Sequence, residues 1–227
     1  MPIIGFSTGS LAPGDFDKAL RLIRRAKLGA VELSAIREEE LDPLVRFLRT
    51  ANLDDFDYVS LHAPSSLARL SEAESVGAFV KIGGPWPVIV HPDVIKDVPV
   101  WRILGNRLCI ENMDQRKASG RTAAELRPLF EALPDARFCL DLAHASQIDP
   151  TMSEARRMLG EFGDRLQQIH ISSIDSRSMH GPLNLVAART FRSVLRGLNT
   201  DIPWILEGVV EEDDVAPEVV FASEMIS

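Results

Sequence analysis

The sequence predicts an α/β fold, a closed (β/α)8 TIM barrel that forms a single domain over residues 1–227. Two observations predict it. Eight short apolar segments of strand-like composition alternate with segments that carry helical periodicity. No stretch rich in Pro, Gly or Ser divides the chain. An open, doubly wound sheet is the alternative, but no predicted strand is followed by the glycine-rich phosphate turn of a dinucleotide fold.

Strands are expected where short apolar runs are bounded by turn residues or end in polar ones. They cover residues 3–7, 30–33, 58–61, 88–90, 108–110, 138–141, 166–169 and 202–206. The run at 138–141 is the most informative, because it ends in Asp141 and His144 follows three residues later. An aspartate in this place is either the N-cap of the next helix or a site residue at the end of a buried strand.

The segments between the strands carry the helical stripes of apolar residues. Asp15 precedes the first stripe, and the pair Asp42-Pro43 predicts that a helix begins there with an N-cap and a proline at its first position. Thr122 and Glu125 have capping-box spacing. The third and fourth crossovers look shortened, because 67–82 is a weak helical pattern and 98–104 supplies one or two turns. Further helices are expected at 152–162, 191–198 and 217–226.

Composition restricts the class of protein. No apolar run is long enough to span a bilayer, and the first residues have no basic segment that would begin a signal peptide. The two cysteines, Cys109 and Cys139, lie in predicted buried strands, which favours reduced thiols and a cytoplasmic location. The formal net charge of −8 disfavours broad nucleic-acid binding, so we expect a small-molecule substrate and no membrane or nucleic-acid partner. A homo-oligomer is left open.

Ionisable residues gather at the carboxyl ends of the predicted strands, where TIM barrels keep their active sites. In chain order they are Glu32, His62, His91, Glu111, Asp141, His170 and Glu207. The other two of the five histidines, His144 and His180, fall in the loops just after the sixth and seventh strands. Imidazole and carboxylate groups together are ligands for Zn²⁺, Mn²⁺ or a related divalent ion. Cys109 and Cys139 would face the barrel interior one layer below Glu111 and Asp141, as small core residues.

These residues occur in an ordered series of motifs. The series is Leu61-His62-Ala63-Pro64, Val90-His91-Pro92, Ile110-Glu111-Asn112, Leu140-Asp141-Leu142-Ala143-His144, Ile169-His170-Ile171 and Leu206-Glu207-Gly208. It resembles the xylose-isomerase-like TIM-barrel superfamily, which includes sugar isomerases and epimerases and also endonuclease IV. The resemblance runs from Ile3 to Gly208 and depends on the order of the motifs, since each motif alone is weak.

The resemblance implies a metal site. In the sugar epimerases of this group one divalent ion is held at the positions of Glu111, Asp141, His170 and Glu207, all present here. In endonuclease IV a three-zinc cluster also uses the positions of His62, His91, His144 and His180. This chain departs from that pattern at Ser178, where endonuclease IV has Asp. Because a hydroxyl is a poor Zn²⁺ ligand, the third zinc site is in doubt.

The leading hypothesis from the sequence is a metal-dependent isomerase or epimerase of a small sugar or sugar-like hydroxy-carbonyl compound, which reacts through an enediolate. Glu111 and Glu207 would transfer the proton. The substrate oxygens would be bound by His144, His180, Arg177 and Glu32.

Two alternatives stay open. The first is a two-zinc phosphodiester hydrolase of the endonuclease IV type, with His62 and His91 on one ion, Asp141, His170 and Glu207 on the other, and Glu111 between them. The second is a non-catalytic barrel that binds a metal or another ligand. The cofactor is therefore expected to be one or two Zn or Mn ions per chain.

Overall fold

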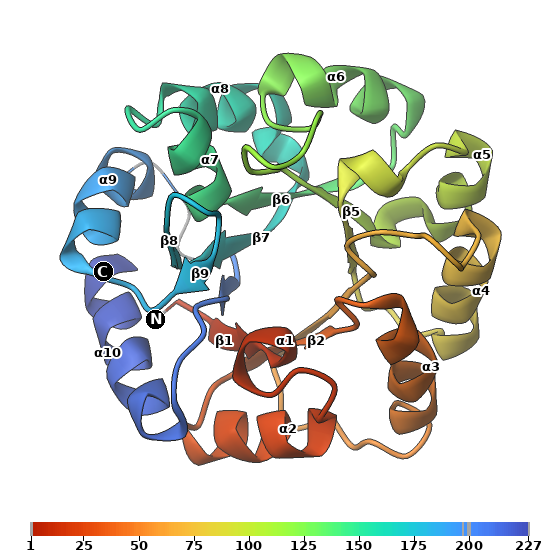
Figure 1. Ribbon diagram of the computed structural model, residues 1–227, viewed down its shortest axis with the longest axis horizontal. Coiled ribbons are helices and arrows are strands. Elements are labelled where there is room, and N and C mark those ends of the chain that lie inside the picture. Colours follow the sequence, from red (N-terminus) through yellow and green to blue (C-terminus); the bar gives the residue numbers. More distant parts are fainter. Residues whose placement is uncertain (1, 197, 199–200, 227) are drawn as a thin grey trace.

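A computed structural model describes residues 2–196, 198 and 201–226 of the chain. Its centre is a closed barrel of eight parallel strands surrounded by helices (Figure 1). The strands are β1 (Ile4–Ser7), β2 (Ala30–Ser34), β3 (Tyr58–His62), β4 (Val88–Val90), β5 (Leu108–Glu111), β6 (Arg137–Asp141), β7 (Leu166–Ile171) and β10 (Trp204–Leu206). They pair in the order β1-β10-β7-β6-β5-β4-β3-β2, and β2 pairs with β1 to close the barrel, which confirms the predicted (β/α)8 fold.

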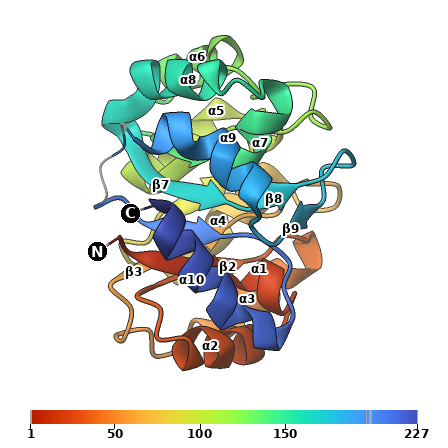
Figure 2. The ribbon, with the colours of Figure 1, turned by 90° about the vertical axis from the view of Figure 1, so that its left-hand side faces the viewer.

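The helices around the barrel follow the strands in sequence, as Figure 1 shows. They are α1 (Thr8–Leu11), α2 (Phe16–Arg25), α3 (Glu38–Phe47), α4 (Glu72–Ile82), α5 (Val98–Trp101), α6 (Ala123–Ala132), α7 (Leu142–Ile148), α8 (Ser153–Phe162), α9 (Leu185–Leu195) and α10 (Val215–Ile226). Asp15 and Thr122 cap α2 and α6 with their side chains, and the second of these caps was predicted from the spacing of Thr122 and Glu125. A short antiparallel hairpin of β8 (Ser173–Ile174) and β9 (His180–Gly181) was not predicted. Figure 2 shows this hairpin at the opposite end of the barrel from the start of β1.

The strands are buried on both faces, which explains their nearly continuous apolar sequence. Outward residues such as Leu108 and Ile110 join the large core between the strands and the helices. Inside the barrel, Ile89, Cys109 and Cys139 form a separate small apolar cluster. Both thiols are free and buried, one layer below Glu111 and Asp141. The site is therefore built on a packed layer and not on an open channel.

The start of α3 differs from the prediction. The helix begins at Glu38, and Pro43 lies inside it. Glu40 supports this start, because its carboxylate accepts from the Arg37 backbone N–H at 3.0 Å and from the Arg37 guanidinium Nε at 2.9 Å. Asp42 is therefore not the cap, because the helix has already begun at Glu38, where the contacts of Arg37 with Glu40 support its start.

The two crossovers that looked shortened differ from each other. The third crossover contains α4, a helix of eleven residues that Ser71 and Glu74 cap. Its helix is therefore of full length, contrary to the prediction. The fourth has only the four-residue α5 between two 3₁₀ segments. A carboxylate on α4 stabilises this crossover, since Glu72 Oε2 accepts from the backbone N–H groups of Lys96 and Asp97 at 2.9 Å and from Trp101 Nε1 at 2.6 Å.

Within the described ranges of the chain, no helix is both long and apolar enough to cross a membrane.

We expect Glu72→Ala to lower the free energy of unfolding by about 2 kcal/mol, because three donors, one of them on the fully buried Trp101, lose a charged acceptor. The measurement is urea unfolding followed by far-UV circular dichroism. Glu131→Ala, an exposed acid on α6, is the matched control and should change little. Equal effects of the two substitutions would show that Glu72 does not anchor the fourth crossover.

Candidate metal centre

The predicted strand-end side chains meet inside the mouth of the barrel. They are Glu32, His62, His91, Glu111, Asp141, His170 and Glu207. Parallel strands in register bring their carboxyl ends to one level, so residues far apart in sequence become neighbours. Asp141, for example, is directly beside His170 in the pairing of β6 and β7. Glu32 lies deeper than the others, because β2 continues for two more residues to Ser34, the partner of His62.

Glu111 lies between two groups of potential ligands. Its Oε2 atom is 3.3 Å from His62 Nε2 and 3.4 Å from His91 Nε2. Its Oε1 atom is 3.2 Å from His170 Nδ1. A carboxylate whose two oxygens face different sets of imidazole nitrogens has the arrangement of a bridge between two cations.

His62 is fixed in a tautomer that suits a metal ligand. Its Nδ1 lies 2.7 Å from the carbonyl oxygen of Ala63, and only an N–H group can satisfy that acceptor. The proton of the neutral ring is thus on Nδ1, and the lone pair is on Nε2, which faces Glu111. The ring of His91 presents Nε2 to the same carboxylate oxygen.

Asp141 combines the two roles that the sequence left as alternatives. Its Oδ1 accepts from the backbone N–H of His144 at 2.7 Å, so it is the N-cap of α7. Its Oδ2 is buried and has no hydrogen-bond partner. Asn112 fixes the backbone of Asp141, because its side chain accepts from the Asp141 N–H at 2.8 Å and donates to the Asp141 carbonyl at 2.9 Å. A rigidly held carboxylate with one free oxygen fits a metal ligand, since a buried oxygen without a partner is otherwise costly.

The second group of donors surrounds that oxygen. Ligand atoms of Glu111, Asp141, His170 and Glu207 all lie within 4.8 Å of one another. His170 Nδ1 is 3.3 Å from Glu207 Oε1. The first group, His62, His91 and Glu111, meets the same 4.8 Å limit and shares only Glu111 with the second.

His144 and His180 contact each other and have definite hydrogen-bond roles. His144 Nδ1 donates to the Asn112 carbonyl at 2.9 Å, so its Nε2 can accept. His180 Nδ1 is 2.8 Å from the Ser172 hydroxyl, and its Nε2 is 3.1 Å from His144 Nε2. A donor on His180 Nε2 and an acceptor on His144 Nε2 satisfy both rings without a cation.

Ser178 adds no carboxylate to this pair. Its hydroxyl donates to Gln147 Oε1 at 2.7 Å, and its backbone has a φ of 59°. Ligand atoms of His144 and His180 do lie within 4.8 Å of one of Asp141, but Asp141 already belongs to the second group. The side chains therefore fit two ions better than three.

The buried negative charge of the site also fits two divalent ions. Glu32, Glu111, Asp141 and Glu207 have side chains that are at most 12 % exposed. Among the described residues, no Lys or Arg forms an ion pair with any of them. Buried carboxylates need compensating charge, and two divalent cations would neutralise these four when the histidines are neutral.

The pKa values of the carboxyl groups reflect the same excess of buried negative charge. Burial, followed by the neighbouring Glu111, raises the pKa of Asp141 to about 6. Burial also raises the pKa of Glu207 well above its usual value, and the adjacent carboxylates add to this. Burial alone would raise the pKa of Glu111 too, but His170, His62 and His91 outweigh it and hold that pKa well below the usual range. Protons and metal ions therefore compete for the same oxygens.

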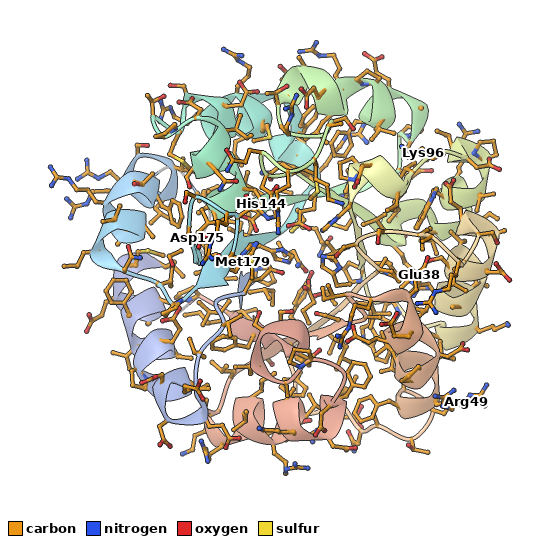
Figure 3. All side chains as sticks on the ribbon, in the orientation of Figure 1. Glu38, Arg49, Lys96, His144, Asp175 and Met179 are labelled. Atoms are coloured by element: carbon orange, nitrogen blue, oxygen red, sulfur yellow. The ribbon has the colours of Figure 1, made fainter. Side chains whose placement is uncertain are left out.

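The donor groups open into a cavity of about 230 Å³ in the barrel mouth. His62, His91, Glu111, His144, His180 and Glu207 form its floor, and its wall includes Arg116, Ile36, Met179 and Val209. Figure 3 shows His144 near the middle of the barrel with Asp175 and Met179 of the β8–β9 hairpin close by, whereas Arg49 and Lys96 lie at the periphery. A cavity of this size suits a small substrate.

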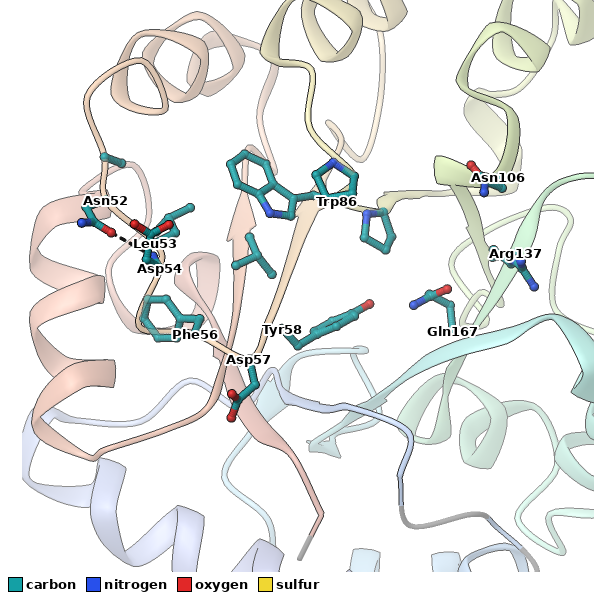
Figure 4. Close-up of a pocket in the computed structure, with 14 residues that line it drawn as sticks. Asn52, Leu53, Asp54, Phe56, Asp57, Tyr58, Trp86, Asn106, Arg137 and Gln167 are labelled. Atoms are coloured by element: carbon teal, nitrogen blue, oxygen red, sulfur yellow. Dashed lines mark hydrogen bonds between the residues drawn. The ribbon is translucent and has the colours of Figure 1, made fainter.

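A larger cavity of about 930 Å³ lies where the strands begin (Figure 4). Its lining includes Tyr58, Trp86 and Arg137 and none of the residues of the donor groups. Because the chemistry of a TIM barrel lies at the carboxyl ends of its strands, we place the functional site at the smaller cavity.

Two predicted substrate contacts lie elsewhere. Arg177 is 82 % exposed, pairs with Asp175 at 3.2 Å and does not line the mouth cavity, where Arg116 does. Glu32 is fully buried beneath the donor groups and does not line the cavity either.

The supporting residues Asn112, Ser172 and Gln168 were not identified from the sequence. Amide and hydroxyl side chains are common in strands and loops, so no sequence pattern sets these three apart from others of their type.

Comparisons with known proteins bear on the fold. No family model matches the chain, and no curated protein matches it in sequence. Among solved structures, endonuclease IV from Thermus thermophilus is similar over 99 % of both chains, with a TM-score of 0.68 and 20 % identity. The 3-keto-D-glucoside 4-epimerase of E. coli has a TM-score of 0.66 and 13 % identity over 99 % of this chain and 100 % of that one.

A third similar structure is a xylose isomerase-like TIM barrel protein from Mycobacterium smegmatis in complex with magnesium. It has a TM-score of 0.57 and 13 % identity over 100 % of this chain and 98 % of its own. At these identities the likeness concerns the fold and not the reaction. The chain has the fold of the xylose-isomerase-like TIM barrels.

Proposed function

We propose that this protein is a two-metal hydrolase of small phosphate esters. The observation that carries the proposal is the position of Glu111, whose two oxygens face two separate groups of donors. The sequence favoured an isomerase, but a reaction with two ions explains His62 and His91 better. Their convergence on Glu111 Oε2 changes the order of preference.

The residues that would hold the ions follow from the two groups. His62, His91 and Glu111 would bind one, and Asp141, His170 and Glu207, with Glu111 shared, would bind the other. Two divalent ions would supply Lewis acidity toward a phosphoryl group and would lower the pKa of water. Zn²⁺ or Mn²⁺ suits these mixed imidazole and carboxylate donors.

The remaining residues of the mouth support binding and positioning of an ester. The Arg116 guanidinium is half exposed on the cavity wall, where it can donate to a phosphoryl oxygen while Asp114 Oδ2 holds it at 2.5 Å. His180 can turn its Nε2 donor from His144 toward a substrate oxygen. Ile36, Met179 and Val209 offer apolar contacts to the organic part of the ester.

The charges around the mouth favour a small ester over a nucleic acid. The loops that follow β2, β3, β5 and β7 carry six basic side chains, and each has an acidic partner within 4.0 Å. They are Arg37, Arg69, Arg116, Lys117, Arg121 and Arg177. A nucleic-acid backbone needs several unpaired cations along its length, whereas one phosphoryl group needs only the N–H groups that Asp114 leaves free on Arg116. The proposal therefore includes no nucleic-acid partner, and the two free thiols support a cytoplasmic location.

A metal-dependent sugar isomerase or epimerase is the second candidate. One observation favours it: Glu111, Asp141, His170 and Glu207 form a complete four-donor group without the other histidines. Glu111 and Glu207 both approach His170 Nδ1, at 3.2 and 3.3 Å, so as ligands of one ion they could also exchange a proton with a bound hydroxy-carbonyl compound. The two candidates differ in the number of ions that activity requires.

We expect the protein, after a chelator has removed bound metal and Zn²⁺ or Mn²⁺ has been added back, to bind two ions per chain. Glu111→Gln should weaken both sites, because both use that carboxylate, whereas His91→Ala should weaken only one. The measurement is metal content by mass spectrometry after equilibrium dialysis, together with calorimetric titration.

Glu218→Gln is the matched control for the first variant, because it alters a buried carboxylate on α10 that accepts from the Leu183 N–H and belongs to neither donor group. It should keep both ions. A Glu111→Gln protein that retains one ion at the affinity of the unsubstituted protein would rule out the bridge.

We expect the metal-loaded protein to hydrolyse bis(4-nitrophenyl) phosphate, and His91→Ala to lower kcat by about 100-fold or more, because one of two ions that stabilise the transition state is lost. Release of 4-nitrophenol is the measurement. A nicking assay on abasic DNA should give little product under the same conditions.

Solvent deuterium incorporation into a panel of ketoses tests the second candidate in the same preparations. Deuterium incorporation that persists in the His91→Ala protein, together with no phosphodiester hydrolysis by the unsubstituted protein, would favour the isomerase over the hydrolase. Bound ions with neither activity would favour the non-catalytic barrel.

A further inference from the structure

Glu32 is a fully buried carboxylate that the proposed reaction does not use. It lies on β2 inside the barrel, level with Ser60 of β3 and one layer below His62. It does not line the mouth cavity, so a substrate cannot reach it. A charged group in this position is costly unless it is paired, which calls for a physical reason for its presence.

The contacts of Glu32 converge on one of its oxygens. Oε2 accepts from the Ser60 hydroxyl at 3.1 Å and from Gln168 Nε2 at 2.7 Å, and it is 3.0 Å from His170 Nε2. The amide of Gln168 is itself held by Tyr58, whose hydroxyl donates to Gln168 Oε1 at 2.7 Å. This bond turns the NH2 group of Gln168 toward Glu32.

The ring of His170 has its two nitrogens in different surroundings. Nδ1 faces Glu111 and Glu207, which belong to the second donor group. If Nδ1 carries the lone pair that binds an ion, the ring proton must be on Nε2. Gln168 Nε2 lies 2.6 Å from the same nitrogen and can only donate, so it suits the other tautomer, with the lone pair on Nε2 and the proton on Nδ1. An ion bound at Nδ1 would select the tautomer with the proton on Nε2, and Glu32 Oε2, at 3.0 Å, is then the acceptor available for that proton.

We propose that Glu32 is a positioning residue for the metal centre: it accepts the Nε2 proton of His170, which fixes the ring tautomer and aims Nδ1 at the ion. A carboxylate behind a ligating histidine also makes the imidazole a stronger donor to the metal. Ser60, Gln168 and Tyr58 hold the carboxylate in place. This inference rests on the proposed metal centre and holds for either candidate reaction.

The other oxygen of Glu32 defines the competing role. Oε1 is buried without a partner, and Glu32 can bring a ligand atom within 4.8 Å of those of His62 and Glu207. A direct ligand and a positioning residue predict different losses on substitution. Removal of a ligand eliminates a site, whereas removal of a positioning residue weakens a site that keeps its ligands.

The test is the isosteric substitution Glu32→Gln, followed by competition for Zn²⁺ with a chromophoric chelator and by the visible spectrum of the Co²⁺-substituted protein. We expect the weaker of the two affinities to fall by about 10- to 100-fold with two ions still bound at saturation, because the ligands themselves are unchanged. The Co²⁺ bands of the site that contains His170 should shift.

Glu218→Gln is the matched control, since it makes the same substitution at a buried carboxylate on α10 that accepts from the Leu183 N–H and belongs to neither donor group. It should leave the Zn²⁺ affinity nearly unchanged. Glu32→Asp, which keeps the charge on a shorter side chain, should recover part of the affinity, and it replaces Glu32→Gln if that variant does not fold.

Three results would overturn the inference, and they are distinguishable. Unchanged affinity and Co²⁺ spectrum in a folded Glu32→Gln protein would leave the carboxylate with a structural role alone. Loss of one ion at saturation would make Glu32 a ligand. If the unsubstituted protein binds no divalent ion, the metal centre itself fails and this inference fails with it.

Discussion

Four buried carboxylates at the mouth of the barrel carry negative charge that no Lys or Arg ion pair neutralises in the described part of the chain. This charge constrains the rest of the site, because it must be balanced by protons or by cations. In the ion-free protein the raised pKa values of Asp141 and Glu207 are one form of that balance. The imidazoles around Glu111 offer nitrogen ligands at the same place, so divalent ions are the other form.

The fold can support this charge because its stability comes from elsewhere. Outward residues of the strands pack against the helices, and the small apolar cluster of Ile89, Cys109 and Cys139 lies inside the barrel beneath the donor groups. One residue serves both needs, since Asp141 caps α7 with one oxygen and leaves the other free. Removing charge from the mouth would therefore alter the chemistry of the site more than the stability of the barrel.

The sequence was sufficient for residues whose place follows from strand ends alone. Glu111, Asp141 and His62 end their strands, and parallel pairing then brings them together whatever the loops do. Arg177 could not be placed in this way, because its direction depends on the β8–β9 hairpin and on Asp175. The start of α3 was missed for a similar reason, since the contacts of Arg37 with Glu40 outweigh the local preference of Asp42-Pro43.

The similar structures include both an endonuclease and an epimerase, so the barrel alone does not select a reaction. A difference in reaction must therefore come from the side chains at the barrel mouth. His62 and His91 would extend a one-ion site to two, while Ser178, bound to Gln147, offers no carboxylate to a third. The direct contact between His144 and His180 satisfies those two rings without a cation. In the proposed metal centre, the number of ions, and with it the choice between a bridged and a single-ion reaction, would thus depend on the histidines and on the neutral contacts of Ser178 and His144, and not on the carboxylates alone.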